Sequence, residues 1–279
     1  MEFSQEKIRF FAKYIEKELG IVYSDSNYFQ LEHRLSDITS QLGLKSLEDL
    51  WMRATSGIDT QLKELLLDIA TNNETSFFRD PSLFVGLVKS IVPELLSANP
   101  QLKELRIWSA ACSNGQEPYS IAMALDEARS ENPNFPNYKI LATDFSERVL
   151  SRTKARTYSQ LELQRGLSAS RLQRYFDPGS APNTWVLNSR IPPSNFQFQQ
   201  LNLLDPWNFD HNFHIVFCRN VLIYQNVDNK IRVIDKILKV FEKDAYLALG
   251  AAESLLGISD LFEQVHFENS VFYRKKRSN

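Results

Sequence analysis

Residues 104–118 read ELRIWSAACSNGQEP, and this stretch decides the fold. It opens with a short apolar run, Leu105–Trp108, which predicts a β-strand. Small residues follow, which let the backbone approach a ligand closely, and Pro118 suits the first turn of a helix. The stretch therefore predicts the strand-to-helix turn of an α/β domain, either a cofactor-binding turn or a tight turn without a ligand. It lacks the GxGxxG pattern of dinucleotide-binding turns.

Similar apolar runs recur toward the C-terminus, and helical segments separate them. Such alternation predicts an α/β fold with a mostly parallel sheet that helices cover on both faces. The last two runs are too close together for a helical crossover, so they should form an antiparallel hairpin. A proline-rich segment, about 175–193, interrupts the alternation and is interpreted as a small β insertion. The predicted strands are 105–108, 139–142, 196–198, 214–217, 246–249, 265–267 and 271–273.

The N-terminal part of the chain shows helical periodicity and no strand pattern. Apolar residues recur there at helical spacing, with Gly20 and Gly43 as natural stops. We therefore expect an all-helical N-terminal domain over residues 1–72, an interdomain segment over 73–80 and the α/β domain over 81–279.

Composition excludes several classes of protein. Lys and Arg total 32 against 34 Asp and Glu, so no global polycation is available for nucleic acid. No run approaches the roughly 18 uninterrupted apolar residues of a membrane span. The start of the chain has no signal-peptide core. These features predict a cytoplasmic protein without nucleic-acid binding or direct membrane insertion.

Polar residues follow two of the predicted strands, at the edge where α/β sheets bind ligands. Asp144 follows the second strand, where an acidic side chain can accept hydrogen bonds from both ribose hydroxyls of an adenosine. The alternative is a helix N-cap, by Asp144 or by Ser146. Arg219, Asn220 and Tyr224 follow the fourth strand within an apolar run. An Arg at this edge indicates either an anion site or a structural ion pair.

Motifs of several other enzyme classes are absent from the sequence. It contains no P-loop and no GxSxG nucleophile elbow. The histidines show no metal-ligand spacing, and no Cys or carboxylate completes a zinc set with His211 and His214. We therefore expect no metal, and a turn beside a strand accounts for these two histidines.

Four segments give the sequence a specific resemblance. They are NETSFFRD at 73–80, SNGQEPYS at 113–120, ATD at 142–144 and FCRNVLIY at 217–224. With them the chain resembles the chemotaxis receptor methyltransferases (the CheR type), which are S-adenosylmethionine-dependent protein-glutamate O-methyltransferases. The resemblance covers nearly the whole length, and the order and spacing of the segments also fit.

The resemblance implies a Rossmann-like S-adenosylmethionine (SAM) methyltransferase domain with a small β subdomain, preceded by the helical domain. It implies that Arg79 and Tyr224 serve catalysis. Arg79 would hold the SAM carboxylate or help set the methyl acceptor, and Tyr224 would stand near the transferring methyl. The residues implied to bind SAM, or its product S-adenosylhomocysteine, are Asn73, Thr75, Arg79, Glu117, Asp144, Asn202, Leu203, Arg219 and Asn220.

The implied positions along the cofactor follow the same resemblance. Glu117 would sit near the methionine end, and Asp144 would take the ribose. Asn202 and Leu203 would flank the adenine. The late segment Gly250–Glu253 reads GAAE, where the family usually has a Gly-His-Ser-Glu or similar run.

The implied partner is the cytoplasmic domain of a chemotaxis receptor, whose glutamates accept the methyl group. Arg34 is the candidate contact, because a guanidinium can bind a carboxylate through two bonds. The alternative is a local ion pair of Arg34 with Asp37. Residues 1–72 hold eight Lys and Arg against twelve Asp and Glu, which opposes an acidic partner. Two other functions stay open: a SAM-binding sensor or tethering module without turnover, and a small-molecule methyltransferase.

Overall fold

The computed structural model divides into two compact units. The first comprises Met1–Asn73 together with Tyr224–Asn229, and the second comprises Glu74–Ile223 and Lys230–Asn279. The domain boundaries expected at residues 72 and 80 stay predictions. The residues that the structure describes are 4–70, 74–132, 134–267 and 269–276.

The described part of the first unit is helical, as its periodicity predicts. Gly20 follows the first helix in the left-handed conformation, with φ 70°, and ends it. The Ser46 side chain accepts the Asp49 N–H and caps the start of a later helix. Phe11 and Leu31 are fully buried. The helices are α1 (Gln5–Leu19), η1 (Asp25–Asn27), α2 (Tyr28–Gln41), α3 (Leu47–Ser56) and α4 (Thr60–Ala70).

A downstream stretch, Tyr224–Asn229, belongs to this helical unit. Ile21 pairs with Gln225 in an antiparallel bridge. The Gln225 side-chain amide donates to the Leu19 carbonyl at 2.8 Å. The chain therefore enters the first unit twice.

The second unit is built on a sheet whose strands are β1 (Glu104–Ala110), β2 (Asn137–Asp144), β6 (Phe196–Gln200), β7 (Phe213–Cys218), β8 (Phe241–Ala248), β9 (Phe262–Phe267) and β10 (Ser270–Lys275). Their order is β6-β2-β1-β7-β8-β10-β9. The first five in this order are parallel neighbours, and β9 with β10 forms the predicted antiparallel hairpin. The expected Rossmann-like sheet is confirmed.

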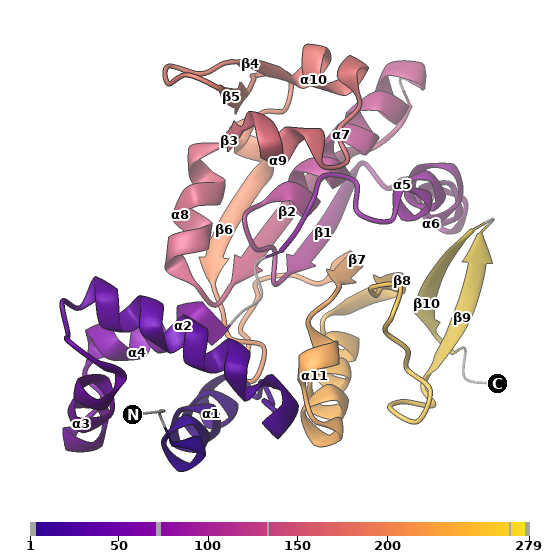
Figure 1. Cartoon of the computed structure of the whole chain (residues 1–279). Coiled ribbons are helices and arrows are strands. Elements are labelled where there is room, and N and C mark those ends of the chain that lie inside the picture. The colour runs from indigo at the N-terminus through magenta and orange to yellow at the C-terminus, as the bar shows by residue number, and fades with distance from the viewer. Residues whose placement is uncertain (1–3, 71–73, 133, 268, 277–279) are drawn as a thin grey trace. The chain divides into compact units, whose positions relative to one another are not determined.

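Helices cover both faces of this sheet (Figure 1). One continuous helix packs on the same face as α7 (Gln116–Glu131). It consists of α5 (Pro81–Gly86), η2 (Leu87–Ile91) and α6 (Val92–Ala98). Next to them, α8 (Glu147–Ala155) lies against β2 and β6. On the other face, α11 (Val227–Lys239) buries Val233, Ile234 and Ile237.

The helix Pro81–Ala98 contains a π-helical turn, for which Pro93 provides a reason. Pro93 has no N–H to donate to the Lys89 carbonyl, and the Val92 N–H bonds to the Leu87 carbonyl, five residues before it. By length and composition alone this helix could cross a membrane, although a core helix passes the same test. Here its apolar side belongs to the core of the unit, where Leu87 is fully buried.

A small antiparallel sheet forms the β subdomain, with strands β3 (Thr157–Ser159), β4 (Phe176–Pro178) and β5 (Thr184–Leu187) in the order β3-β5-β4. The predicted segment 175–193 contains β4 and β5. The subdomain also includes β3, which lies before that segment and is too short to show strand alternation. The short helices of this region are α9 (Gln160–Gln164), α10 (Ala169–Tyr175) and η3 (Pro193–Asn195), and η4 (Leu222–Tyr224) follows β7.

Candidate active site

The carboxyl ends of β1, β2 and β7 lie side by side in the second unit. Ala110 at the end of β1 is in register with Thr143 of β2 and with Cys218 of β7. The segments that follow these strands therefore meet at one edge of the sheet, where ligands bind in open α/β folds.

The turn after β1 is built from left-handed backbone positions. Ala111 has φ 59°, Ser113 has φ 51° and Gly115 has φ 88°. A Cβ on Gly115 would lie 2.4 Å from the Cγ2 atom of Thr153 in α8, so glycine is required where the turn meets this helix. This conformation packs the backbone of the turn closely against Thr153 and Tyr158. A turn that binds a ligand needs the same close approach of its backbone.

Strained backbone collects around this edge of the sheet. Non-glycine residues with positive φ cost on the order of 1–3 kcal/mol and cluster at active sites and ligand clamps. Of the eight such residues among those described, five belong to segments that carry predicted site residues: Phe78, Asp80, Ala111, Ser113 and Asn220. This clustering supports a functional site here.

Asp144 ties together the turns after β1 and β2. It is 6% exposed, and its two oxygens accept the N–H groups of Ser113 at 2.9 Å and Ser146 at 3.0 Å. The Ser146 hydroxyl accepts the Val149 N–H, so Ser146 is the N-cap of α8. The bonds of Asp144 to ribose hydroxyls stay a prediction.

Arg219 is the buried centre of a charge network. Its side chain is 2% exposed, and Nη1 donates to Glu117 Oε2 at 2.9 Å. Nη2 donates to the Asp80 carboxylate and, at 2.9 Å, to the Arg79 carbonyl. The other Glu117 oxygen accepts the Ser109 hydroxyl at 2.7 Å. Of the two interpretations of Arg219, the structural ion pair is confirmed. Its contact with the cofactor stays a prediction.

The charges of this network fit SAM, which carries a sulfonium, an ammonium and a carboxylate. Two carboxylates, of Glu117 and Asp80, surround one guanidinium, so negative charge is in local excess, as a cationic ligand requires. The Arg219 Nε atom is buried and, among the described residues, has no hydrogen-bond partner. A buried donor without a partner is costly, and an anionic group of a ligand would satisfy it.

The segment Glu74–Asp80 is fixed to the second unit by its backbone. Phe78 is buried with φ 50°, and its N–H donates to the Ser120 hydroxyl at 2.9 Å. The next carbonyl, that of Arg79, is the one that Arg219 binds. These contacts hold the chain where it passes the network.

The predicted residues of this segment differ in their surroundings. The Arg79 side chain is exposed, and its Nη1 donates to the Glu74 carbonyl at 3.3 Å. Thr75 is half-buried. Asn73 lies outside the described residues. The roles of these three residues stay predictions.

Asn202 and Leu203, which are predicted to flank the adenine, lie in a turn that a side chain of α11 stabilises. The Asn202 side-chain oxygen accepts the Leu204 N–H at 3.0 Å. Lys236 donates to the carbonyls of Leu203 and Asp205, at 2.8 Å for Asp205. Burial lowers the pKa of Lys236 to about 8. Sequence reasoning missed Lys236, because a single Lys in an amphipathic helix is typical of a solvated face.

Glu253 closes the GAAE segment compared with the family above, but no role was predicted for it, although it lies beside a predicted site residue. Asn220 has φ 57° directly after β7, and the Glu253 carboxylate accepts its backbone N–H at 2.7 Å. The family's Gly-His-Ser-Glu run was the signal that could have found this residue.

Two predicted residues belong to the first unit. Tyr224 is half-buried, and its carbonyl accepts the Val22 N–H at 3.0 Å. Arg34 Nη1 donates to the Ile69 carbonyl at 2.7 Å and, more weakly, to the Tyr23 hydroxyl at 3.3 Å. Within the described part of the unit, Arg34 thus bonds to the end of α4 and forms no ion pair with Asp37. The roles of Tyr224 in catalysis and of Arg34 in partner binding stay predictions.

His214 lies within β7 and not in a turn beside the strand. Its Nδ1 accepts the Arg106 N–H at 3.0 Å across the sheet. Burial lowers the pKa of His214 to about 4, so the ring is neutral near pH 7.

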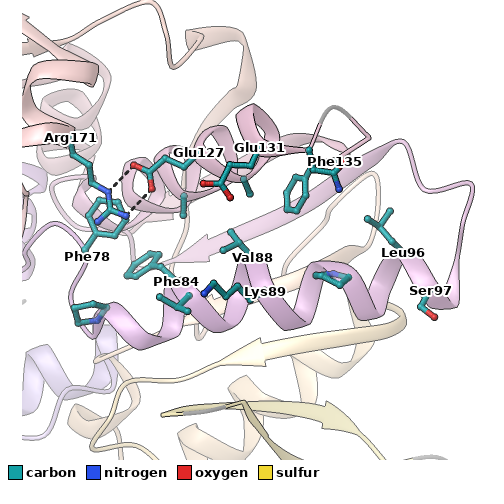
Figure 2. A pocket seen from close by; sticks show the side chains of 16 residues that line it. Phe78, Phe84, Val88, Lys89, Leu96, Ser97, Glu127, Glu131, Phe135 and Arg171 are labelled. Atoms are coloured by element: carbon teal, nitrogen blue, oxygen red, sulfur yellow. Dashed lines mark hydrogen bonds and ion pairs between the residues drawn. The ribbon is translucent and has the colours of Figure 1, made fainter.

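A separate groove of about 740 Å³ lies between the helix Pro81–Ala98 and α7. Figure 2 shows Phe84 and Val88 on one side of it and Arg171 at one end. Arg171 binds Glu127 through two bonds, of 2.9 and 2.8 Å, and its guanidinium lies 3.6 Å from the centre of the Phe78 ring. The groove is not lined by any residue predicted to bind the cofactor.

The fold and the sheet edge together define the class of this protein. A parallel sheet closed by an antiparallel hairpin carries a small-residue turn after β1, a buried carboxylate after β2 and a charge network suited to a sulfonium ligand. The chain is a SAM-dependent methyltransferase.

Comparisons with known proteins identify the family. The family described as "CheR methyltransferase, SAM binding domain" matches residues 73–271. Chemotaxis protein methyltransferase Cher2 of Pseudomonas putida is 40% identical over 270 residues, which cover 95% of this chain and 96% of that protein. Chemotaxis protein methyltransferase 1 of Pseudomonas aeruginosa is 41% identical over 271 residues, with the same coverage of 95% and 96%. The chain belongs to the CheR methyltransferase family, and the resemblance stated from its sequence is confirmed.

Proposed function

We propose that this enzyme transfers the methyl group of SAM to glutamate side-chain carboxylates of chemotaxis receptors. Family membership over nearly the whole chain is the observation that carries this proposal. The acceptor would be the cytoplasmic domain of the receptor, so the reaction is placed in the cytoplasm. Methylation of this kind would tune chemotactic adaptation.

The cofactor residues proposed on this chain are those that the family resemblance implies, and the contacts at the sheet edge support several of them. Asp144 would accept the ribose hydroxyls, and Glu117 would face the ammonium end. Arg219 would hold Glu117 in place and offer Nε to an anionic group. The turn at Leu203, which Lys236 braces, would contact the adenine. Asn73, Thr75, Arg79, Asn202 and Asn220 complete the proposed set.

The chemistry needs positioning more than acid–base catalysis. Bound SAM supplies an electrophilic methyl group on its sulfonium. A glutamate side chain has a pKa of about 4.3 and is already ionised near pH 7, so no general base is required. Holding the reacting groups in line can contribute roughly 7–11 kcal/mol to lowering the barrier. We assign acceptor positioning to Arg79 and to the Tyr224 hydroxyl, which can orient a carboxylate without protonating it.

The test is incubation of the protein with methyl-labelled SAM and purified receptor cytoplasmic domains. We expect label in the receptor as a base-labile methyl ester, and loss of labelling when the accepting glutamates are replaced by alanine. Arg79→Ala should reduce the rate while the protein stays folded, as circular dichroism would verify.

Three outcomes would contradict the proposal. Tight SAM binding without any transfer would indicate a sensor. Label in a small molecule would indicate a different acceptor class. Base-stable label would exclude an ester product.

A further inference from the structure

The Glu253 carboxylate gathers four backbone N–H groups from two loops. Its Oε2 atom accepts from Asn220 at 2.7 Å and from Gly250 at 2.8 Å. Its Oε1 atom accepts from Val221 at 3.0 Å and from Ile223 at 3.1 Å. A carboxylate has about four acceptor positions, so these bonds use its full capacity.

In the loop that donates these bonds, Asn220, Val221 and Ile223 give their N–H groups to the Glu253 carboxylate. The loop leaves β7 through a left-handed residue, Asn220, with φ 57°. Backbone N–H groups outside a strand ladder need a partner when they are shielded from water. Arg219, which precedes the bonded residues, and Leu222, which lies among them, are buried. Strand pairing ends with β7 at Cys218, and beyond it the Glu253 carboxylate is the hydrogen-bond acceptor for the N–H groups of this loop.

The second loop approaches closely because Gly250 has no side chain. A Cβ at this position would lie 2.6 Å from the Asn220 side-chain nitrogen and 2.9 Å from Glu253 Oε2. Glycine therefore lets the segment after β8 reach the loop after β7. Glu253 then joins the two at the carboxyl edge of the sheet.

We propose that Glu253 is a positioning residue for methyl transfer, which fixes the loop Asn220–Ile223 in its binding conformation. This inference rests on the proposed function, because it takes Asn220 to line the SAM site. Glu253 acts through the backbone: it orients Asn220 and the buried Arg219 beside it. A role in stability alone would leave cofactor affinity of the folded protein unchanged.

The decisive variant is Glu253→Gln, which keeps the shape of the side chain. One oxygen becomes an NH₂ group that faces two backbone donors, so two bonds are lost. We expect the dissociation constant of S-adenosylhomocysteine, measured by calorimetry, to rise about tenfold or more. The methyl-transfer rate at saturating SAM should fall as well. Glu263→Gln is the matched control, because it makes the same charge change at the Arg274 pair in the β9–β10 hairpin.

Gly250→Ala provides a second, independent variant should Glu253→Gln fail to fold. It keeps the carboxylate but pushes a Cβ toward Asn220, and it should weaken cofactor binding in the same way. Asn220→Ala tests the site itself. If Asn220→Ala weakens binding while Glu253→Gln and Gly250→Ala leave both affinity and rate unchanged, the inference is overturned. If Asn220→Ala also changes nothing, the proposed site is wrong, and the inference fails with it.

Discussion

The carboxylate of Asp144 already bonds two backbone N–H groups, and we propose that it also accepts the cofactor ribose. Replacement of Asp144 by Ala should weaken SAM and S-adenosylhomocysteine binding by about 1.5–3 kcal/mol for each charge-assisted bond lost. Calorimetry on the folded variant measures this change. Asp260→Ala, at an exposed loop position of the same unit, is the control.

Wild-type affinity in Asp144→Ala would contradict the ribose assignment. The residue would then serve only to tie Ser113 to Ser146.

At the residue scale, the sequence identified polar groups that interrupt apolar runs, such as Asp144 and Arg219. It did not identify residues that act through backbone atoms. Glu253 and Lys236 bind N–H and carbonyl groups of distant segments, and nothing in their neighbours along the chain reports those partners. Such roles depend on which loops the fold brings together, so they could be found only in the structure.

At the scale of elements, Arg34 of α2 is bonded to the end of α4. Its guanidinium donates to the Ile69 carbonyl, near the negative end of the helix dipole. We expect Arg34→Met, which keeps the aliphatic length, to lower the free energy of unfolding by about 1–3 kcal/mol. Denaturant unfolding measures it. Arg53→Met, which removes a more exposed ion pair with Asp59, should cost less.

The opposite result would favour the partner role. If Arg34→Met leaves the unfolding free energy unchanged but lowers the rate with limiting receptor at saturating SAM, Arg34 contacts the receptor. An unchanged rate at low salt, where surface charges act most strongly, would place receptor docking elsewhere.

Elements with a clear apolar pattern were predicted close to their observed positions, and those without one were not. The run 246–249 predicted β8, yet the strand begins at Phe241. Its first half is partly exposed and contains Asp244 with φ 64°, so no alternation marks it. The strand β3 has three residues, too few for a pattern to be visible.

At the scale of the whole molecule, we expect turnover to need no metal. The acceptor carboxylate is ionised near pH 7, and the methyl group is already activated on the sulfonium. Rates of methyl transfer with and without EDTA should agree. Activity that EDTA abolishes and a divalent cation restores would contradict this prediction.

The return of the chain to the helical unit at Tyr224–Asn229 limits how the protein can be recombined with its relatives. A chimera that exchanges only the N-terminal helices would pair a foreign Leu19 and Ile21 with the resident Gln225. The exchange therefore has to carry the distant six-residue stretch along with the helices. With a graft border drawn along the sequence, the carbonyl that the buried Gln225 amide needs comes from a foreign helix end, whereas a border drawn along the contacts keeps the native bridge intact.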